Sequence, residues 1–158
     1  MVGPPTVEAF LKKHRALALD TSAFIYFVEQ HPRYFPLCEK LFAGIETGRF
    51  TACTSTLTLL EVLVQPYRLQ KDDIVLKFYA LLTSYPNLTW VPVGLNVADK
   101  AAQIRAGYRL KTPDAIQAAS AIVAGATGFI CNDKAYQQVE EFECLIIDEY
   151  APRRSLGL

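Results

Sequence analysis

Four carboxylates lie at points in the sequence where predicted strands or helices meet. Asp20 ends the apolar run in LALDTSAFIY and Asp133 lies in CNDKAY, whereas Glu61 and Asp114 belong to the helix-like stretches TLLEVLVQP and TPDAIQAAS. Oxygen ligands without histidine or thiolate suit a hard cation such as Mg²⁺ or Mn²⁺. Such ions can activate water and stabilise the departing oxygen when a phosphodiester is hydrolysed. These residues could do that chemistry only if the fold brings them together.

Two of these carboxylates, Asp20 and Glu61, also have purely structural explanations. Asp20 can cap the helix that follows it by accepting a hydrogen bond from a free backbone N–H. Glu61 shares a helical stripe with Thr58, Gln65 and Arg68, which could be an ordinary solvent-exposed face. Taken singly, neither residue identifies a site.

The same holds for the two later aspartates. Asp114 follows Thr112, a candidate N-cap, and Pro113, a candidate first helical residue, at a position where the helix dipole favours a negative charge. Asp133 is of a residue type common in turns and at helix starts. Only the joint pattern of the four residues can distinguish chemistry from capping.

Composition restricts the possible classes of protein. The 158 residues are 51% hydrophobic and 20% charged, which is typical of a single globular domain with a real core, and the formal net charge is zero. Attraction to phosphate must therefore come from local basic patches or bound metal. No signal peptide or membrane span is predicted, so we expect a cytoplasmic protein with no membrane partner. The cysteines show no paired spacing, which favours reduced thiols over a zinc site: Cys38, Cys53, Cys131 and Cys144.

The elements that must position the carboxylates alternate along the chain. Short apolar runs predict strands at 15–20, 49–55, 87–93, 128–133 and 143–148. Helical patterns predict helices at 22–30, 36–47, 56–65, 71–84, 96–107, 112–125 and 134–141. This alternation indicates an α/β fold, a three-layer α/β/α sandwich with a mainly parallel sheet of about five strands. The expected organisation is an N-terminal segment 1–14 with a short helix, one domain 15–150, and a tail 151–158.

A parallel sheet gives the polar residues a common location. The functional crevice of such sheets lies at the carboxyl ends of the strands. We expect the first and fourth strand ends to be adjacent there, with two flanking helices turning Glu61 and Asp114 into the same crevice. Four carboxylates that meet repel each other unless protons or cations neutralise them. The joint pattern therefore predicts a Mg²⁺ or Mn²⁺ site.

At these residues the sequence resembles the PIN-domain family, and within it the VapC-type toxin ribonucleases. The resemblance rests on LDTSAFI, on Glu61 within TLLEVLVQP, on TPDAIQAASAI and on FICNDKAY, and its span covers most of the chain. It implies a metal-dependent endoribonuclease in which residues matching Asp20, Glu61, Asp114 and Asp133 are catalytic and hold the metal. Ser22 and Asn132 match supporting positions that would orient ligands or water.

The resemblance also implies partners. VapC-type toxins are inhibited by a cognate antitoxin, so an antitoxin protein, a homodimer and an RNA substrate are expected. Strand one begins almost at the initiator methionine in those toxins, whereas about fifteen residues precede it here. A PIN-like nuclease outside a toxin–antitoxin pair thus stays open.

The strongest local basic patch leads towards Asp114. In RAGYRLK, we predict RNA-phosphate contacts for Arg105, Arg109 and Lys111. The same cations could instead complement the C-terminal dipole of a helix.

Other classes place an aspartate after the first strand. A haloacid-dehalogenase-like phosphatase needs a second aspartate two residues later, where this chain has Ser22. A receiver-like domain needs an acidic pair near the first strand, which is absent, although Lys134 would suit its late lysine. A non-catalytic PIN-like RNA-binding module remains an alternative, because sequence does not report carboxylate separations.

Overall fold

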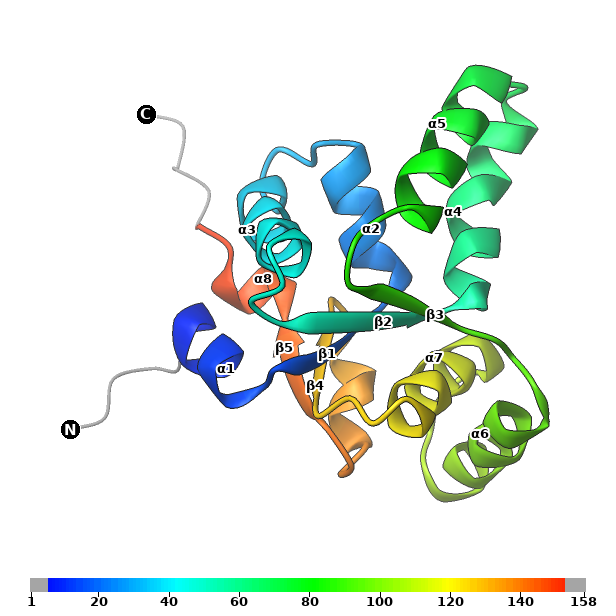
Figure 1. Ribbon diagram of the computed structural model, residues 1–158. Helices are drawn as coiled ribbons and strands as arrows, with labels where there is room; N and C mark the ends of the chain where they lie inside the picture. The colour runs from blue at the N-terminus through cyan, green and yellow to red at the C-terminus, as the bar shows by residue number, and fades with distance from the viewer. Residues whose placement is uncertain (1–5, 153–158) are drawn as a thin grey trace, which may run out of the picture.

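The computed structural model describes residues 6–152 and contains a five-stranded parallel sheet in the order β3-β2-β1-β4-β5 (Figure 1). The strands are β1 (Ala16–Leu19), β2 (Thr51–Ser55), β3 (Leu88–Val91), β4 (Gly128–Cys131) and β5 (Glu143–Ile146). The central strand β1 pairs with both β2 and β4, with Leu19 opposite Ile130 at its carboxyl end. The predicted α/β/α sandwich and its parallel sheet are confirmed.

Helices cover both faces of this sheet (Figure 1). One face packs against α2 (Thr21–Val28), α3 (Phe35–Glu46), α4 (Thr56–Arg68) and α5 (Asp72–Thr83), with α1 (Val7–Lys13) and α8 (Ile147–Tyr150) at its border. The opposite face packs against α6 (Leu95–Gly107), α7 (Thr112–Val123) and the 3₁₀ helix η1 (Lys134–Gln138).

The central strands are apolar because they have no solvent-facing side. All four residues of β4, GFIC, are buried, and β1 exposes only part of its first residue. In β1, Leu17 and Leu19 face the core under α2 and α3, whereas Ala18 faces the core under α7. Alternation of side chains along each strand thus divides the apolar residues between two cores.

Two helices end three residues away from their predicted C-terminal ends, whereas the other predicted boundaries are within two residues. The helix predicted at 56–65 continues through Pro66 to Arg68, and the backbone bond from Leu69 N to Gln65 O, at 3.0 Å, maintains the helical pattern past the proline. The helix ends at Arg68, and the chain turns two residues later at Gln70, which has a positive φ of 53°. The helix predicted at 134–141 is instead the five-residue 3₁₀ helix η1.

The terminal segments and the cysteines can also be compared with the sequence prediction. The helix α1 lies inside the predicted segment 1–14, and of the predicted tail 151–158 only residues 151 and 152 are described. The four cysteines are free, as expected. Within residues 6–152, no helix combines the length and apolar character needed to cross a membrane.

Candidate active site

The site begins where β1 and β4 end side by side. Asp20 directly follows β1, and its backbone N–H donates to the carbonyl of Ile130 in β4 at 2.9 Å, one residue beyond the last strand pair. Asn132 and Asp133 directly follow β4. The sheet therefore brings the first and last predicted aspartates to the same edge.

Asp20 is the electrostatic centre of the four carboxylates. It is the N-cap of α2, and its Oδ1 accepts from the N–H of Thr21 at 2.8 Å. The pKa of Asp20 is raised to about 7, mainly by desolvation and further by the negative charges of Glu61, Asp114 and Asp133, against the lowering effect of the Thr21 bond. All three other carboxylates therefore act on Asp20.

Glu61 projects from the second turn of α4 and has an exposed side chain. Its Oε1 accepts from the hydroxyl of Thr21 at 2.8 Å and from the side-chain amide of Gln117 at 3.2 Å. Thr58, on the same stripe, is fully buried, so the stripe is not a continuous solvent face. Glu61 is therefore not part of an uninterrupted solvent-exposed stripe, which was the basis for interpreting it as an ordinary surface residue.

Asp114 is partly buried near the start of α7. Its Oδ1 accepts from the hydroxyl of Tyr136 at 3.1 Å. Desolvation raises its pKa, the Tyr136 bond lowers it, and the charges of Asp133 and Glu61 raise it again. The predicted capping arrangement was wrong, because the N-cap is Lys111 and Thr112 is already helical.

Asp133 has an exposed side chain and caps η1, with its Oδ1 accepting from the N–H of Ala135 at 2.8 Å. Asp20 and Asp133 are thus both helix caps and members of the charged site. Capping uses one carboxylate oxygen of each residue, so it does not exclude a second role.

The donor chemistry of these residues fits a hard divalent cation. None of the four carboxylates takes part in an ion pair with a residue of the described chain. Ser22, two residues after Asp20, has a buried hydroxyl without a hydrogen-bond partner among residues 6–152. These side chains nevertheless do not stand in a ready-made metal-ligand group of three or more among the described residues. The fit lies in charge and ligand type, and a cation would have to draw the carboxylates together.

A family model described as the PIN domain matches residues 17–141, which include all four carboxylates. The chain belongs to the PIN-domain family. No curated protein matches it at a significant level.

Several solved structures share the fold of this PIN domain at low sequence identity. One is VapBC2 from Rickettsia felis bound to a promoter DNA fragment, with a TM-score of 0.66, 15% identity, and coverage of 82% of this chain and 97% of that one. A toxin–antitoxin complex from Klebsiella pneumoniae matches with a TM-score of 0.64 and 16% identity, and the match covers 83% of this chain and 97% of that one. VapBC-5 from Mycobacterium tuberculosis matches with a TM-score of 0.53 and 23% identity, and the match covers 83% of this chain and 98% of that one.

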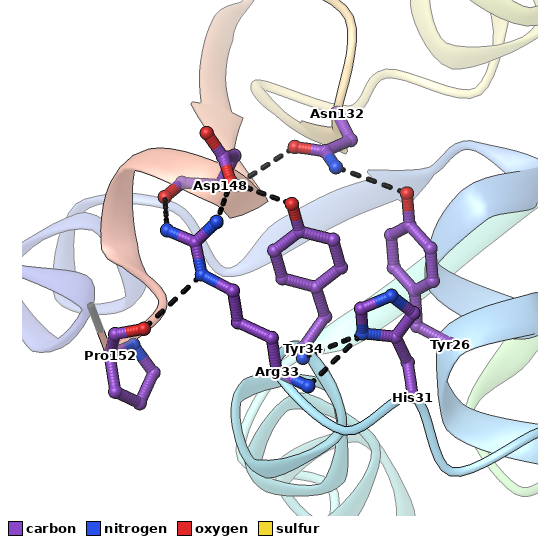
Figure 2. Close-up of polar contacts among 7 residues, drawn as sticks. All are labelled: Tyr26, His31, Arg33, Tyr34, Asn132, Asp148 and Pro152. Atoms are coloured by element: carbon purple, nitrogen blue, oxygen red, sulfur yellow. Dashed lines mark hydrogen bonds and ion pairs between the residues drawn. The ribbon is translucent and has the colours of Figure 1, made fainter. Parts of the chain in front are cut away.

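Asn132 of the PIN domain belongs to a polar cluster with Tyr26, Arg33, Tyr34 and Asp148 (Figure 2). Its Oδ1 accepts from the N–H of Asp148 at 2.8 Å, and its amide donates to the hydroxyl of Tyr26 at 3.0 Å. Asp148 in turn accepts from Arg33 at 2.7 Å and from Tyr34 at 2.6 Å. Asn132 therefore anchors the loop that carries Asp133 to α2 and α8.

The three predicted RNA-binding residues are exposed, with Arg105 in the last turn of α6 and Arg109 and Lys111 in the connection to α7. Arg105 donates to the hydroxyl of Thr112 at 2.7 Å, and the backbone of Arg109 exchanges hydrogen bonds with the side chain of Gln138. Lys111 is close enough to lower the pKa of Asp114. The basic patch thus borders the carboxylates, as its sequence position suggested.

The sequence analysis did not single out the residues that hold Glu61 and Asp114 in place. Gln117 and Thr58 are buried and Thr21 is nearly so, while Tyr136 is 1% exposed. A signal was present for two of them, since Gln117 lies three residues after Asp114 and Thr58 three before Glu61. Residues at that spacing share a helix face.

Proposed function

We propose that this PIN domain is a metal-dependent endoribonuclease that hydrolyses RNA phosphodiesters and acts as the toxin of a type II toxin–antitoxin pair. The observation that carries the proposal is the convergence of the four carboxylates at the carboxyl edge of the sheet: Asp20 and Asp133 follow adjacent strands, Glu61 bonds to Thr21 beside Asp20, and Asp114 bonds to Tyr136 of η1. Capping alone gives no reason for four acidic residues from separate elements to share one edge without a basic ion-pair partner among residues 6–152. Family membership supports the same activity.

The four carboxylates would hold Mg²⁺ or Mn²⁺. When bound, such a cation lowers the pKa of a coordinated water and neutralises charge on the phosphate. The chain itself orients the ligands: Tyr136 donates to one oxygen of Asp114, and Thr21 and Gln117 donate to one oxygen of Glu61. The Ser22 hydroxyl, which lacks a partner among residues 6–152, would orient a ligand or a water.

The basic patch would position the substrate. Arg105 and Lys111 are at the end of α7 that carries Asp114, so phosphates of a single-stranded RNA bound there would lead towards the carboxylates. These basic residues would position the RNA, whereas the carboxylates would serve the chemical step.

An antitoxin protein and a second copy of the chain are the proposed partners. The support is the fold shared with chains of toxin–antitoxin complexes from Rickettsia felis and Klebsiella pneumoniae. Co-expression with the product of any small adjacent open reading frame, followed by size-exclusion chromatography, tests both assemblies.

The activity is tested with purified protein and single-stranded or looped RNA. We expect cleavage only with Mg²⁺ or Mn²⁺, leaving 5′-phosphate and 3′-hydroxyl ends as the family resemblance implies, and no cleavage by Asp114→Asn. Cleavage undiminished by EDTA would refute the metal requirement. RNA binding without cleavage in either metal would identify a non-catalytic RNA-binding module instead.

A further inference from the structure

Gln117 lies on α7 one turn after Asp114, and only 3% of its surface is exposed. We infer that Gln117 is a positioning residue that fixes the rotamer of Glu61 and leaves one defined oxygen of that carboxylate for the cation. This inference rests on the proposed metal site and adds to it the residue that shapes one ligand.

The contacts of Gln117 join three helices. Its side-chain amide nitrogen lies 3.1 Å from both Thr21 Oγ1 and Thr58 Oγ1 and 3.2 Å from Glu61 Oε1, so its two protons serve three acceptors and one proton is shared. Those partners belong to α2 and α4, whereas Gln117 belongs to α7. A buried amide with such partners is costly to remove, because Thr21 and Thr58, which are buried, would lose a donor in a place that water does not readily reach.

The direction of the Thr54 and Thr58 hydroxyl protons follows from one backbone carbonyl. Thr54 donates its hydroxyl proton to the carbonyl of Leu19 at 2.8 Å, so its oxygen must accept from Thr58, 2.7 Å away. Thr58 has then used its only proton, and its oxygen accepts from Gln117. Leu19 is the residue before Asp20, so strand β1 orients the network from beneath the site.

The hydrogen bonds on the Glu61 side also require the Gln117 amide to act as a donor. Thr21 donates its proton to Glu61 at 2.8 Å, so its oxygen is left to accept from Gln117. Both sets of hydrogen bonds require the nitrogen of the Gln117 amide, not its oxygen, to point at Thr21, Thr58 and Glu61. The oxygen lies 3.5 Å from Thr58, the longest separation in the network.

The consequence for Glu61 is an asymmetric carboxylate. Its Oε1 receives two donors, from Thr21 and Gln117, whereas no residue of the described chain donates to its Oε2. Glu61 is exposed, so without these donors its side chain would sample several rotamers. The network holds Oε1 and presents Oε2, which favours binding of the cation through one oxygen.

The first experiment compares Gln117→Met with Ser120→Ala. Methionine is close to glutamine in size and has no N–H donor, and Ser120 is a matched control because it is buried on the same helix and bonds only to Ile116 O. Mn²⁺ binding is measured by electron paramagnetic resonance and calorimetry, and folding by circular dichroism in EDTA. We expect Gln117→Met to weaken Mn²⁺ binding about tenfold or more, and Ser120→Ala to leave it unchanged.

A double-mutant cycle separates positioning from a general structural effect. If Gln117 acts through Glu61, then Gln117→Met should change Mn²⁺ affinity little in a Glu61→Gln background. A tenfold effect of Gln117→Met in both backgrounds would overturn the inference, because the effect would then not pass through Glu61. Equal Mn²⁺ affinity of the wild type and a folded Gln117→Met variant would overturn it as well.

A second pair of variants serves if Gln117→Met does not fold. Thr21→Ser keeps the hydroxyl that donates to Glu61, and Thr21→Val removes it at nearly constant volume. The inference requires Thr21→Ser to retain Mn²⁺ affinity and Thr21→Val to lose it, and equal affinities would contradict it. Wild-type protein that binds no Mn²⁺ overturns the proposed function together with this inference, whereas Mn²⁺ binding unaffected by these variants overturns the inference alone.

Discussion

The substitution Asp20→Asn tests the charge arrangement on which the proposed activity depends. Asparagine keeps the shape of the side chain and caps helices nearly as well, so the bond from Thr21 N–H can be kept. It removes the charge on which Glu61, Asp114 and Asp133 act. The metal-free variant should therefore be at least as stable as the wild type, while losing cleavage.

The size of the effect follows from the pKa of Asp20, which is raised from 3.8 to about 7. Because the folded state binds the proton more tightly, this group favours folding below about pH 4, and its contribution is lost as pH rises towards 7. The difference corresponds to an upper bound of roughly 4 kcal/mol above pH 7. Desolvation of the asparagine amide offsets part of it, so we expect a gain of about 1–3 kcal/mol at pH 8.

Thermal and urea unfolding in EDTA at pH 5 and pH 8 measure this gain, which should be larger at pH 8. Repeating the melts in millimolar Mg²⁺ or Mn²⁺ should stabilise the wild type and have little effect on Asp20→Asn, because a cation that binds only the folded state raises its stability. If Asp20 only caps α2, the two proteins should show equal metal-induced shifts. That result would refute the reasoning.

Two further predictions concern the neighbours of the carboxylates. Replacing Arg105, Arg109 and Lys111 together by glutamine should weaken RNA binding and reduce the slope of log K against log salt by up to about three. The rate of cleavage at saturating RNA should be largely kept. An unchanged slope would assign these residues to a solvated helix end. Tyr136→Phe removes the bond that lowers the pKa of Asp114, so this pKa should rise and Mn²⁺ binding, measured by calorimetry, should weaken more at pH 6 than at pH 8.5. An equal loss at both pH values would contradict that explanation.

The local order of elements could be predicted from the sequence because it depends on short-range patterns. The apolar runs ending at Leu19 and Cys131 predicted strands, and the hydrophilic residues directly after them predicted where the chain leaves the sheet. The alternation with helices was enough to predict a parallel sheet covered on both faces, because parallel strands require crossover connections. Asp20 and Asp133 could be placed at one edge on that basis.

Only the tertiary structure decided which polar side chains serve the carboxylates. Asn132 and Asp133 are neighbours in sequence, yet Asn132 bonds to Asp148 and Tyr26, whereas Asp133 caps η1. Gln117 and Thr58 are buried beneath Glu61, although glutamine and threonine are usually exposed. Gln117 is 56 positions from Glu61 and 59 from Thr58 in the chain, and these residues meet because their helices pack against a sheet with a particular strand order. Local periodicity reports which face a residue occupies, whereas the identity of a hydrogen-bond partner depends on where distant elements meet.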